Sequence, residues 1–257
     1  MSDDARFIAV ALAGGVLERD FRRANFAVPN KAYLPVGGVT MVERVLRALR
    51  GSASVSRIRC VTQPSAFAAA FGNDRSFCDD VIAPGTDLID SMLAGFAGLP
   101  PAQMVLVAAT DIPLVTPRAI DAFAAAARAL DCDLGYGCIR REAHVAAYPT
   151  IRHTWVRLSE GTFCGGGVSV IRAGAAAHIA SILRDFAAVR KSPLRLASLF
   201  SPFLVVRTAL GLVGIAELER RASELTGVTC RAIPSDEPVL GVNVDRLDDL
   251  IAVARLV

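Results

Sequence analysis

Two segments of the sequence combine residue types that suit phosphate chemistry. The first is "LAGG", an apolar run with two glycines, which comprises Leu12, Ala13, Gly14 and Gly15. Paired glycines after a strand let backbone N–H groups approach a ligand closely and point at phosphates. Arg19 and Lys31 follow within the same stretch and supply positive charge for a triphosphate. The alternative is a tight turn whose Arg19 and Lys31 are merely solvated.

The second segment is "AATDIPLVTP", in which Asp111 ends the most apolar run of strand length in the chain. A carboxylate has no packing reason to stand there. It could hold Mg²⁺, which keeps several waters and bridges to substrate phosphates. The alternative is a side chain that caps a turn before Pro113.

Two common nucleotide-binding motifs are missing from the sequence. Neither GxGxxG nor GxxxxGK[ST] occurs anywhere in the chain. A dinucleotide-dependent dehydrogenase and a P-loop enzyme are therefore both poorly supported.

The elements that must position these residues alternate between strand and helix in the first half of the chain. Apolar periodicity predicts strands at 6–14, 58–64, 79–85 and 104–113 and helices at 41–51, 87–99 and from Thr116. Thr116 and Pro117 are typical of a helix start. This alternation predicts a mainly parallel sheet with right-handed crossovers.

The second half is less regular. Strands are predicted at 133–141, 154–163, 165–172, 228–233 and 241–244, with a helical insertion at about 173–226 and a final helix from about 246. No linker rich in Pro, Gly or Ser divides the chain, which favours one domain over residues 1–257. The predicted fold class is α/β, a three-layer α/β/α Rossmann-like arrangement.

Composition narrows the classes of function. The chain has 257 residues, 53% of them hydrophobic, and a net charge of only +3, which gives no support for a nucleic-acid partner. Its six cysteines form no CxxC pair. Buried thiols in a cytoplasmic protein are expected rather than disulfides or a zinc site.

A strongly apolar run at 196–215 is interrupted by Pro202, Arg207 and Gly211 and is too short for a convincing membrane span. One interpretation is a buried or homodimer-forming helical hairpin. The other is an interfacial patch that contacts a membrane or receives an apolar substrate.

Taken together, "LAGG", Arg19, Lys31 in "PNKAYLPVGG", "TDIP" and "GVNVDRLDDL" resemble the pattern of the MobA-like and sugar-phosphate nucleotidyltransferases. The resemblance covers nearly the whole chain and is strongest at 7–50 and 104–118. It implies a Rossmann-like nucleotidyltransferase fold of the kind that related glycosyltransferases share. It also implies Mg²⁺ and transfer of a nucleotidyl group from an NTP to a phosphorylated small-molecule acceptor.

The resemblance also implies roles for individual residues. Residues 12–15 match the nucleotide-holding loop, Arg19 and Lys31 the catalytic cations, and Asp111 the metal-binding aspartate. Further nucleotide contacts are expected from Gly85, Thr86 and Ser91. Asn243 and Asp245 are the candidates for a second metal ligand, although Asp245 also suits the N-cap of the last helix. Residues 12–31 would form a lid that closes over the triphosphate.

The acceptor is expected near "RREAHVAAYPTIRHTWVRLSEGTFCGGGVSV", where Arg152 and Arg157 could grip a phosphate and Gly165 and Gly166 would admit a substrate. A solvated basic face is the alternative.

One departure from the family pattern keeps two other functions open. Leu17 stands where the loop's third glycine is usual and could crowd the triphosphate, which would suit a catalytically silent nucleotide-binding module. A glycosyltransferase of related fold ranks last, because that class typically has Asp-x-Asp after the fourth strand, where this chain has Thr110-Asp111-Ile112-Pro113.

Overall fold

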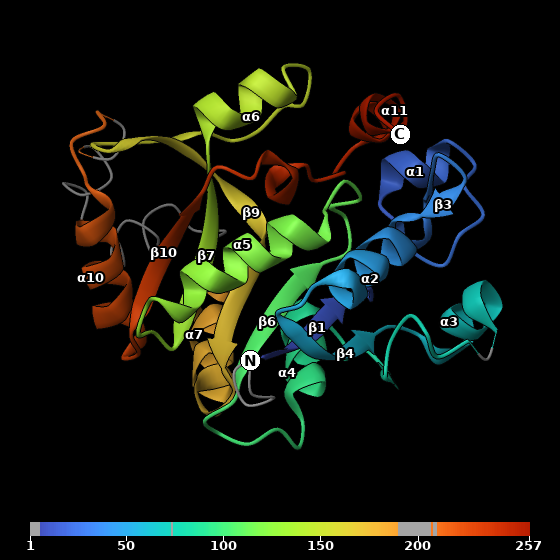
Figure 1. Ribbon diagram of the computed structural model, residues 1–257, viewed down its shortest axis with the longest axis horizontal. Coiled ribbons are helices and arrows are strands. Elements are labelled where there is room, and N and C mark those ends of the chain that lie inside the picture. Colours follow the sequence, from blue (N-terminus) through green and yellow to red (C-terminus); the bar gives the residue numbers. More distant parts are fainter. Residues whose placement is uncertain (1–5, 73, 190–206, 208–209) are drawn as a thin grey trace.

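A central sheet organises the computed structural model, which describes residues 6–72, 74–189, 207 and 210–257 (Figure 1). The strands of this sheet, within the described residues, are β1 (Phe7–Leu12), β4 (Val55–Val61), β5 (Asp80–Ile82), β6 (Met104–Ala109), β7 (Leu134–Arg140), β8 (Val156–Leu158), β9 (Gly161–Arg172) and β10 (Cys230–Ser235). A separate small hairpin consists of β2 (Pro35–Val36) and β3 (Val39–Thr40).

The strand order is β10-β7-β9-β6-β1-β4-β5, with β8 paired to β9. β9 runs antiparallel to β6, β7 and β8, and the other neighbours in the order are parallel. The predicted mainly parallel sheet is therefore confirmed. The strands predicted at 154–163 and 165–172 are in fact the hairpin β8–β9, whose second strand continues through the three glycines.

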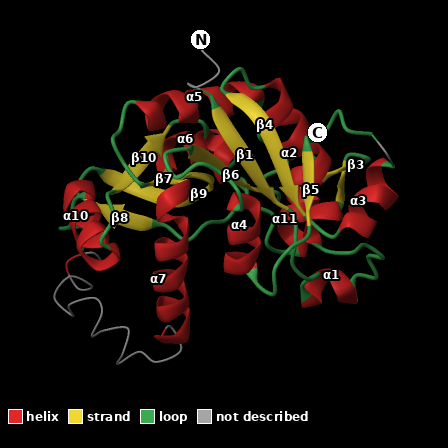
Figure 2. Ribbon diagram, turned by 90° about the horizontal axis from the view of Figure 1, so that it is seen from below, coloured by secondary structure: helices red, strands yellow, loops and turns green. Residues whose placement is uncertain are grey.

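Helices cover both faces of the sheet. They are α1 (Arg19–Arg23), α2 (Met41–Gly51), α3 (Pro64–Phe71), α4 (Leu88–Phe96), α5 (Pro117–Arg128), α6 (Arg141–Ala147), α7 (Ala176–Val189), α10 (Ile215–Thr226) and α11 (Leu247–Ala254), with short 3₁₀ turns η2 (Lys31–Tyr33), η3 (Ala173–Ala175) and η4 (Pro238–Gly241). Figure 2 shows α4 and α7 on one side of the sheet and α5 on the other.

Alternation along the strands explains these layers, because successive strand side chains point to opposite faces. In β6, Leu106 and Ala108 belong to the core beneath α2 and α5. Val105 and Val107 belong to the core beneath α4 and α7. Both faces of β6 are thus apolar, and its carboxyl end is the first point at which a charge can be placed.

Capping fixes where the helices after the strands begin. The Thr116 hydroxyl accepts a hydrogen bond from Ala119 N at 3.2 Å, and Pro117 is the first residue of α5, as predicted. α4 begins in the same way, since the Asp87 carboxylate accepts from Asp90 N at 2.7 Å. Such caps hold the loops at the strand ends in place.

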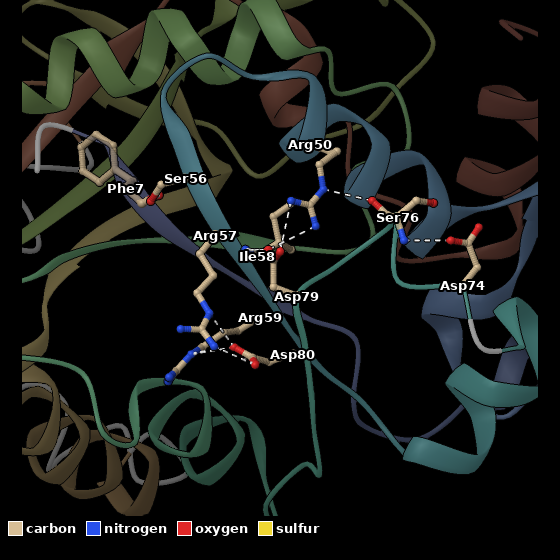
Figure 3. Close-up of polar contacts among 10 residues, drawn as sticks. All are labelled: Phe7, Arg50, Ser56, Arg57, Ile58, Arg59, Asp74, Ser76, Asp79 and Asp80. Atoms are coloured by element: carbon tan, nitrogen blue, oxygen red, sulfur yellow. Dashed lines mark hydrogen bonds and ion pairs between the residues drawn. The ribbon is translucent and has the colours of Figure 1, made fainter. Parts of the chain in front are cut away.

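Ion pairs fasten the outer strand β5 to β4 (Figure 3). The Asp80 carboxylate lies 2.9 Å from Arg57 Nε and 3.4 Å from Arg59 Nε. Asp79 pairs with Arg50 at 3.1 Å and accepts from Ile58 N at 2.7 Å. These contacts lie on the far side of the sheet from β7 and β10 and leave the strand ends free for a ligand.

The C-terminal segment departs from the prediction in two ways. Residues 241–244 are not a strand of the sheet: Gly241 ends η4, and residues 242–244 follow without regular secondary structure, with Val244 N donating to Asp111 O at 2.9 Å. Asp245 is not the N-cap of α11, because that position belongs to Arg246. The Asp249 carboxylate accepts from the backbone N–H groups of Asp245 and Arg246 instead.

α6 was not predicted, and much of the apolar run at 196–215 lies outside the described residues. α7 and α10 lie at the two ends of the segment predicted as a helical insertion. All six cysteines are free, and five are buried, as expected. Within the described residues, the structure has no helix long and apolar enough to cross a membrane.

Candidate active site

A cavity of about 580 Å³ opens at the carboxyl ends of β1 and β6. Its walls come from the loop after β1, from the end of β6 and from β9. The lining residues include Leu12, Gly14, Gly15, Lys31, Asp111, Gly166, Ser169 and Asn243. This is where ligands bind in open parallel sheets, and the sequence-predicted loops meet here.

The loop after β1 is held by buried hydrogen bonds to its backbone. Ala13 O accepts from Asn30 Nδ2 at 3.0 Å and from Thr62 Oγ1 at 3.1 Å, and Thr110 Oγ1 donates to Leu12 O at 2.7 Å. These hydrogen bonds hold the backbone of Leu12 and Ala13 and so fix the position of the following glycines beside the cavity. Asn30 is buried, and its side-chain oxygen accepts a hydrogen bond from Ala32 N at the start of η2. This cap fixes the backbone position of Lys31, the first residue of η2.

The two glycines of the loop have different reasons to be glycine. A Cβ on Gly14 would lie 2.9 Å from the Pro84 ring, so a side chain would push the loop away from the 84–91 segment. Gly15 has a φ of 102°, a left-handed conformation that other residues rarely adopt. Both features favour the close backbone approach expected of a phosphate-binding loop.

Lys31 is the centre of charge in the cavity. Its Nζ lies 2.7 Å from Asp111 Oδ2, 3.0 Å from Asp245 Oδ1 and 3.6 Å from Glu18 Oε1. Burial by itself would lower the pKa of Lys31, but the carboxylates of Asp111 and Asp245 outweigh it and hold the pKa well above the usual lysine value. Lys31 is therefore a fixed cation, suited to binding phosphate rather than to moving a proton.

Two oxygen atoms in the cavity wall have no hydrogen-bond partner in the part of the chain that the structure describes. They are Asp111 Oδ1 and Asn243 Oδ1, and both are buried. A buried acceptor without a partner is costly unless a ligand satisfies it. One carboxylate and one amide oxygen are ligands that Mg²⁺ accepts beside water and substrate phosphate, so the residues fit this ion. No cluster of three or more His, Cys, Asp or Glu side chains suited to a metal occurs among the described residues.

Asp245 is less well placed than Asn243. Its side chain is 68% exposed and pairs with Lys31, but it is not part of the cavity lining. The structure thus brings Asp111 and Asn243 together in the wall, with Asp245 outside them.

Arg19 and Leu17 lie away from the cavity lining. Arg19 begins α1 and is exposed. Leu17 is 7% exposed and packs in an apolar cluster that includes Phe21 and the α11 residues Leu250 and Val253. The bulk of Leu17 is therefore absorbed by the core, which removes the reason for expecting it to crowd a triphosphate.

The 85–91 segment flanks the glycine loop, and its Leu88 lines the cavity, whereas the predicted contacts Gly85, Thr86 and Ser91 do not. Ser91 is buried, and its hydroxyl donates to Asp87 O at 2.7 Å and accepts from Gly85 N at 3.1 Å. The Thr86 hydroxyl donates to the Asp90 carboxylate. In this structure these predicted nucleotide contacts shape the segment beneath Gly14.

The predicted acceptor residues are dispersed. Gly166 lines the cavity, and Gly165 lies directly under the phenol of Tyr136, whose oxygen a Cβ would meet at 2.3 Å. Arg152 lines a separate polar hollow together with Asp245 and other residues, and the Arg157 side chain lies against Gly211.

Sequence reasoning missed three residues of the site. Asn30 stands immediately before Lys31, and an Asn at that point is a recognisable N-cap signal. Glu18 and Tyr136 carry no comparable local signal, since their roles depend on which strands are neighbours.

Fold and site together define an α/β protein with a polar cavity at the carboxyl ends of its parallel strands, and comparison with known proteins gives its family. The description "MobA-like NTP transferase domain" matches residues 9–186, and the chain belongs to this family. It is a family of nucleotidyltransferases. No curated protein matches the sequence significantly.

Several solved structures are similar over almost the whole chain. A hypothetical transferase from Thermus thermophilus is 32% identical, with a TM-score of 0.81 over 95% of this chain and 99% of that chain. CMP:2-keto-3-deoxy-manno-octonic acid synthetase complexed with CTP is 16% identical, with a TM-score of 0.59 over 98% of both chains. A nucleotidyl transferase from Methanothermobacter is 20% identical, with a TM-score of 0.57 over 98% of this chain and 97% of that chain. The last two share the fold.

Proposed function

We propose that the protein transfers a nucleotidyl group from an NTP to a phosphorylated small-molecule acceptor and releases pyrophosphate, with Mg²⁺ as cofactor. The observation that carries this proposal is the Lys31–Asp111 ion pair of 2.7 Å at the end of β6. Beside this pair lie the two unpartnered oxygens of Asp111 and Asn243. A fixed cation and free oxygen ligands in one cavity suit a metal–triphosphate complex.

In this proposal Asp111 and Asn243 hold the Mg²⁺ ion, which supplies positive charge to the phosphates when bound. An oxygen of the acceptor phosphate attacks the α-phosphorus of the NTP, and the bond from that phosphorus to the bridging oxygen of the departing pyrophosphate breaks. The acceptor phosphate is already an anion, so no general base is required. The protein's part is alignment and charge stabilisation.

The chain's own residues divide this work. Gly14 and Gly15 present backbone N–H groups to the nucleotide, and the hydrogen bonds from Asn30 and Thr62 keep the loop in place. The Lys31 ammonium exchanges part of its contact with the carboxylates for contact with the phosphates and neutralises charge on the leaving group. Exposed Arg19 adds charge on the same stretch of chain, which would act as a lid.

The proposal is tested by thermal unfolding with ATP, GTP, CTP and UTP, each with and without Mg²⁺, followed by an assay of pyrophosphate release with a panel of acceptor phosphates. A ligand at a hundred times its Kd adds about 2.7 kcal/mol of stability. We expect one nucleotide to raise Tm by several degrees and to need Mg²⁺ for this. Binding without pyrophosphate release with any acceptor would instead indicate a silent nucleotide-binding module, and no shift with any nucleotide would contradict the proposal.

A further inference from the structure

A second cavity, of about 340 Å³, lies between α10 and the β7–β10 end of the sheet. Its lining is mostly apolar and includes Leu134, Cys138, Leu158, Ile215, Leu218 and Ala222. α10 is hydrogen-bonded to β10 through Glu219 and Ser223, yet none of its residues is fully buried, and part of its apolar face borders the cavity. Apolar surface left open in this way is typical of a binding site, because filling it removes the surface from water.

The two charged side chains in this lining are engaged elsewhere. Glu219 Oε1 accepts from Ala232 N at 2.8 Å, and its other oxygen lies 4.0 Å from Arg231 Nη1. Arg231 also donates to Cys230 O at 3.1 Å. Both charged side chains among the described lining residues thus have a partner, and the rest of that lining is mostly apolar, which suits a hydrocarbon group better than a sugar phosphate or a nucleotide.

The apolar cavity adjoins the candidate active site. Tyr136 lines both cavities, while the consecutive residues Gly165 and Gly166 line one each. Tyr136 pairs in register with Ser169, which also lines the active-site cavity. The two cavities thus lie on one face of the sheet, on either side of a tyrosine ring that remains 52% exposed.

We propose that the apolar cavity binds the hydrocarbon chain of the acceptor. The acceptor is then an aliphatic or similarly apolar monophosphate, whose chain lies beneath α10 and whose phosphate passes Tyr136 towards Lys31 and Asp111. This inference rests on the proposed function, because it places the acceptor of the same reaction. In this scheme the active-site cavity binds the nucleotide, and the apolar cavity selects the acceptor.

The test uses octyl phosphate and butyl phosphate as probes, below the concentration at which either aggregates, with isothermal titration calorimetry on the full chain. Since each buried methylene contributes a similar free energy, octyl phosphate should bind roughly a hundredfold more tightly than butyl phosphate. Equal affinities, or no binding of octyl phosphate, would overturn the inference.

Two variants of α10 locate the binding. Ala222 lines the cavity and Ala216 is exposed on the same helix, so Ala222→Phe fills the cavity while Ala216→Phe adds the same bulk outside it. Ala222→Phe should weaken octyl phosphate binding by about tenfold or more and Ala216→Phe should not change it. Unchanged binding in Ala222→Phe would overturn the proposal. Leu218→Gln, which introduces a polar group with little change in volume, provides the same test should Ala222→Phe not fold.

The nucleotide-induced shift in Tm, measured on the same proteins, separates the two proposals. A retained nucleotide shift with no octyl phosphate binding removes the apolar acceptor site and leaves the nucleotidyltransferase proposal standing. Octyl phosphate binding without a shift for any NTP overturns the acceptor role, because the cavity would then serve an apolar ligand of another process.

Discussion

The two cavities that meet at Tyr136 differ in how their walls are held. The active-site cavity contains charged groups that other polar groups fix, such as Lys31 between carboxylates, and the loop beside it is held by two donors on Ala13 O. The apolar cavity is lined mostly by apolar side chains of the β7–β10 end of the sheet and of α10, which do not fill the space between these elements. Charge chemistry needs fixed geometry to be effective, whereas a hydrocarbon chain requires only volume and dryness.

The difference also follows the topology. The charged wall comes largely from the parallel strands β1 and β6 and their loops. The apolar wall comes from the region around antiparallel β9, with β7, β8, β10 and α10. β9 and Tyr136 contribute to both cavities, so the two regions meet along this strand.

Removing the Lys31 cation should have the largest effect on stability. Lys31→Met leaves the Asp111 carboxylate, whose side chain is 18% exposed, without its partner. We expect a loss of about 3 kcal/mol, measured by urea denaturation at pH 7, because breaking a largely buried ion pair leaves an uncompensated charge. Lys31→Met/Asp111→Asn should recover part of this loss. Strictly additive effects would mean that the pair is not coupled and that the charged wall is not fixed as described.

Lys31 and Asp111 were predictable because each stands next to a strong pattern, a glycine loop after a strand and the end of a buried strand. The fold was predictable for the same reason, since β1, α2, β4, α4, β6 and α5 all have clear periodicity. The sequence could not predict the direction in which Leu17 points, because the partners that bury it include residues of α11, more than two hundred positions away.

Most of the apolar cavity had no signal in the sequence; among its described lining residues, Ile215 alone belongs to the apolar run at 196–215, for which contact with an apolar substrate is one interpretation. Leu134, Cys138 and Ala222 each read as ordinary core positions, and whether neighbouring elements pack without a gap is a property of the tertiary structure. The dispersal of Arg152 and Arg157 has a similar cause, since α6 and the β8–β9 hairpin direct them away from the strand ends.

Leu17→Ala tests whether Leu17 belongs to the apolar core beside the active-site cavity. Leu17 is almost fully buried, so the substitution should cost about 3 kcal/mol of unfolding free energy, through lost burial and a residual cavity. The measurement is urea denaturation, with Val16→Ala as control, since Val16 is 78% exposed. If Leu17→Ala were as stable as Val16→Ala, Leu17 would not be part of this core in solution.

The free energy of unfolding should fall at acidic pH because of His144 in α6. Burial, followed by the neighbouring His153, lowers the pKa of His144 from its ordinary 6.5 to about 4. The unfolded chain therefore binds a proton at a higher pH than the folded one, so stability is lost as pH falls through this window. Between pH 7 and pH 5 the loss should be about 2 kcal/mol in urea denaturation. His144→Phe should remove this part of the pH dependence, and an unchanged pH profile in that variant would contradict the assignment.

Two glycines of β9, at the place where the two cavities meet, should differ in their tolerance of a side chain. A Cβ on Gly167 would lie 2.5 Å from the fully buried Ile112, whereas one on Gly165 would meet the movable end of Tyr136. Gly167→Ala should therefore cost on the order of 1 kcal/mol, and Gly165→Ala should cost less. Thermal unfolding of the two variants checks this order, and the reverse order would show that Tyr136 is held more firmly than Ile112.

The most direct test of the central claim is calorimetric titration of the preferred NTP with Mg²⁺ into wild type, Asp111→Asn and Asp245→Asn. Asp111 carries an unpartnered oxygen in the wall and Asp245 is 68% exposed at its edge. The account predicts a Kd raised about a hundredfold in Asp111→Asn and changed by less than about threefold in Asp245→Asn. Equal affinity in wild type and Asp111→Asn would contradict it.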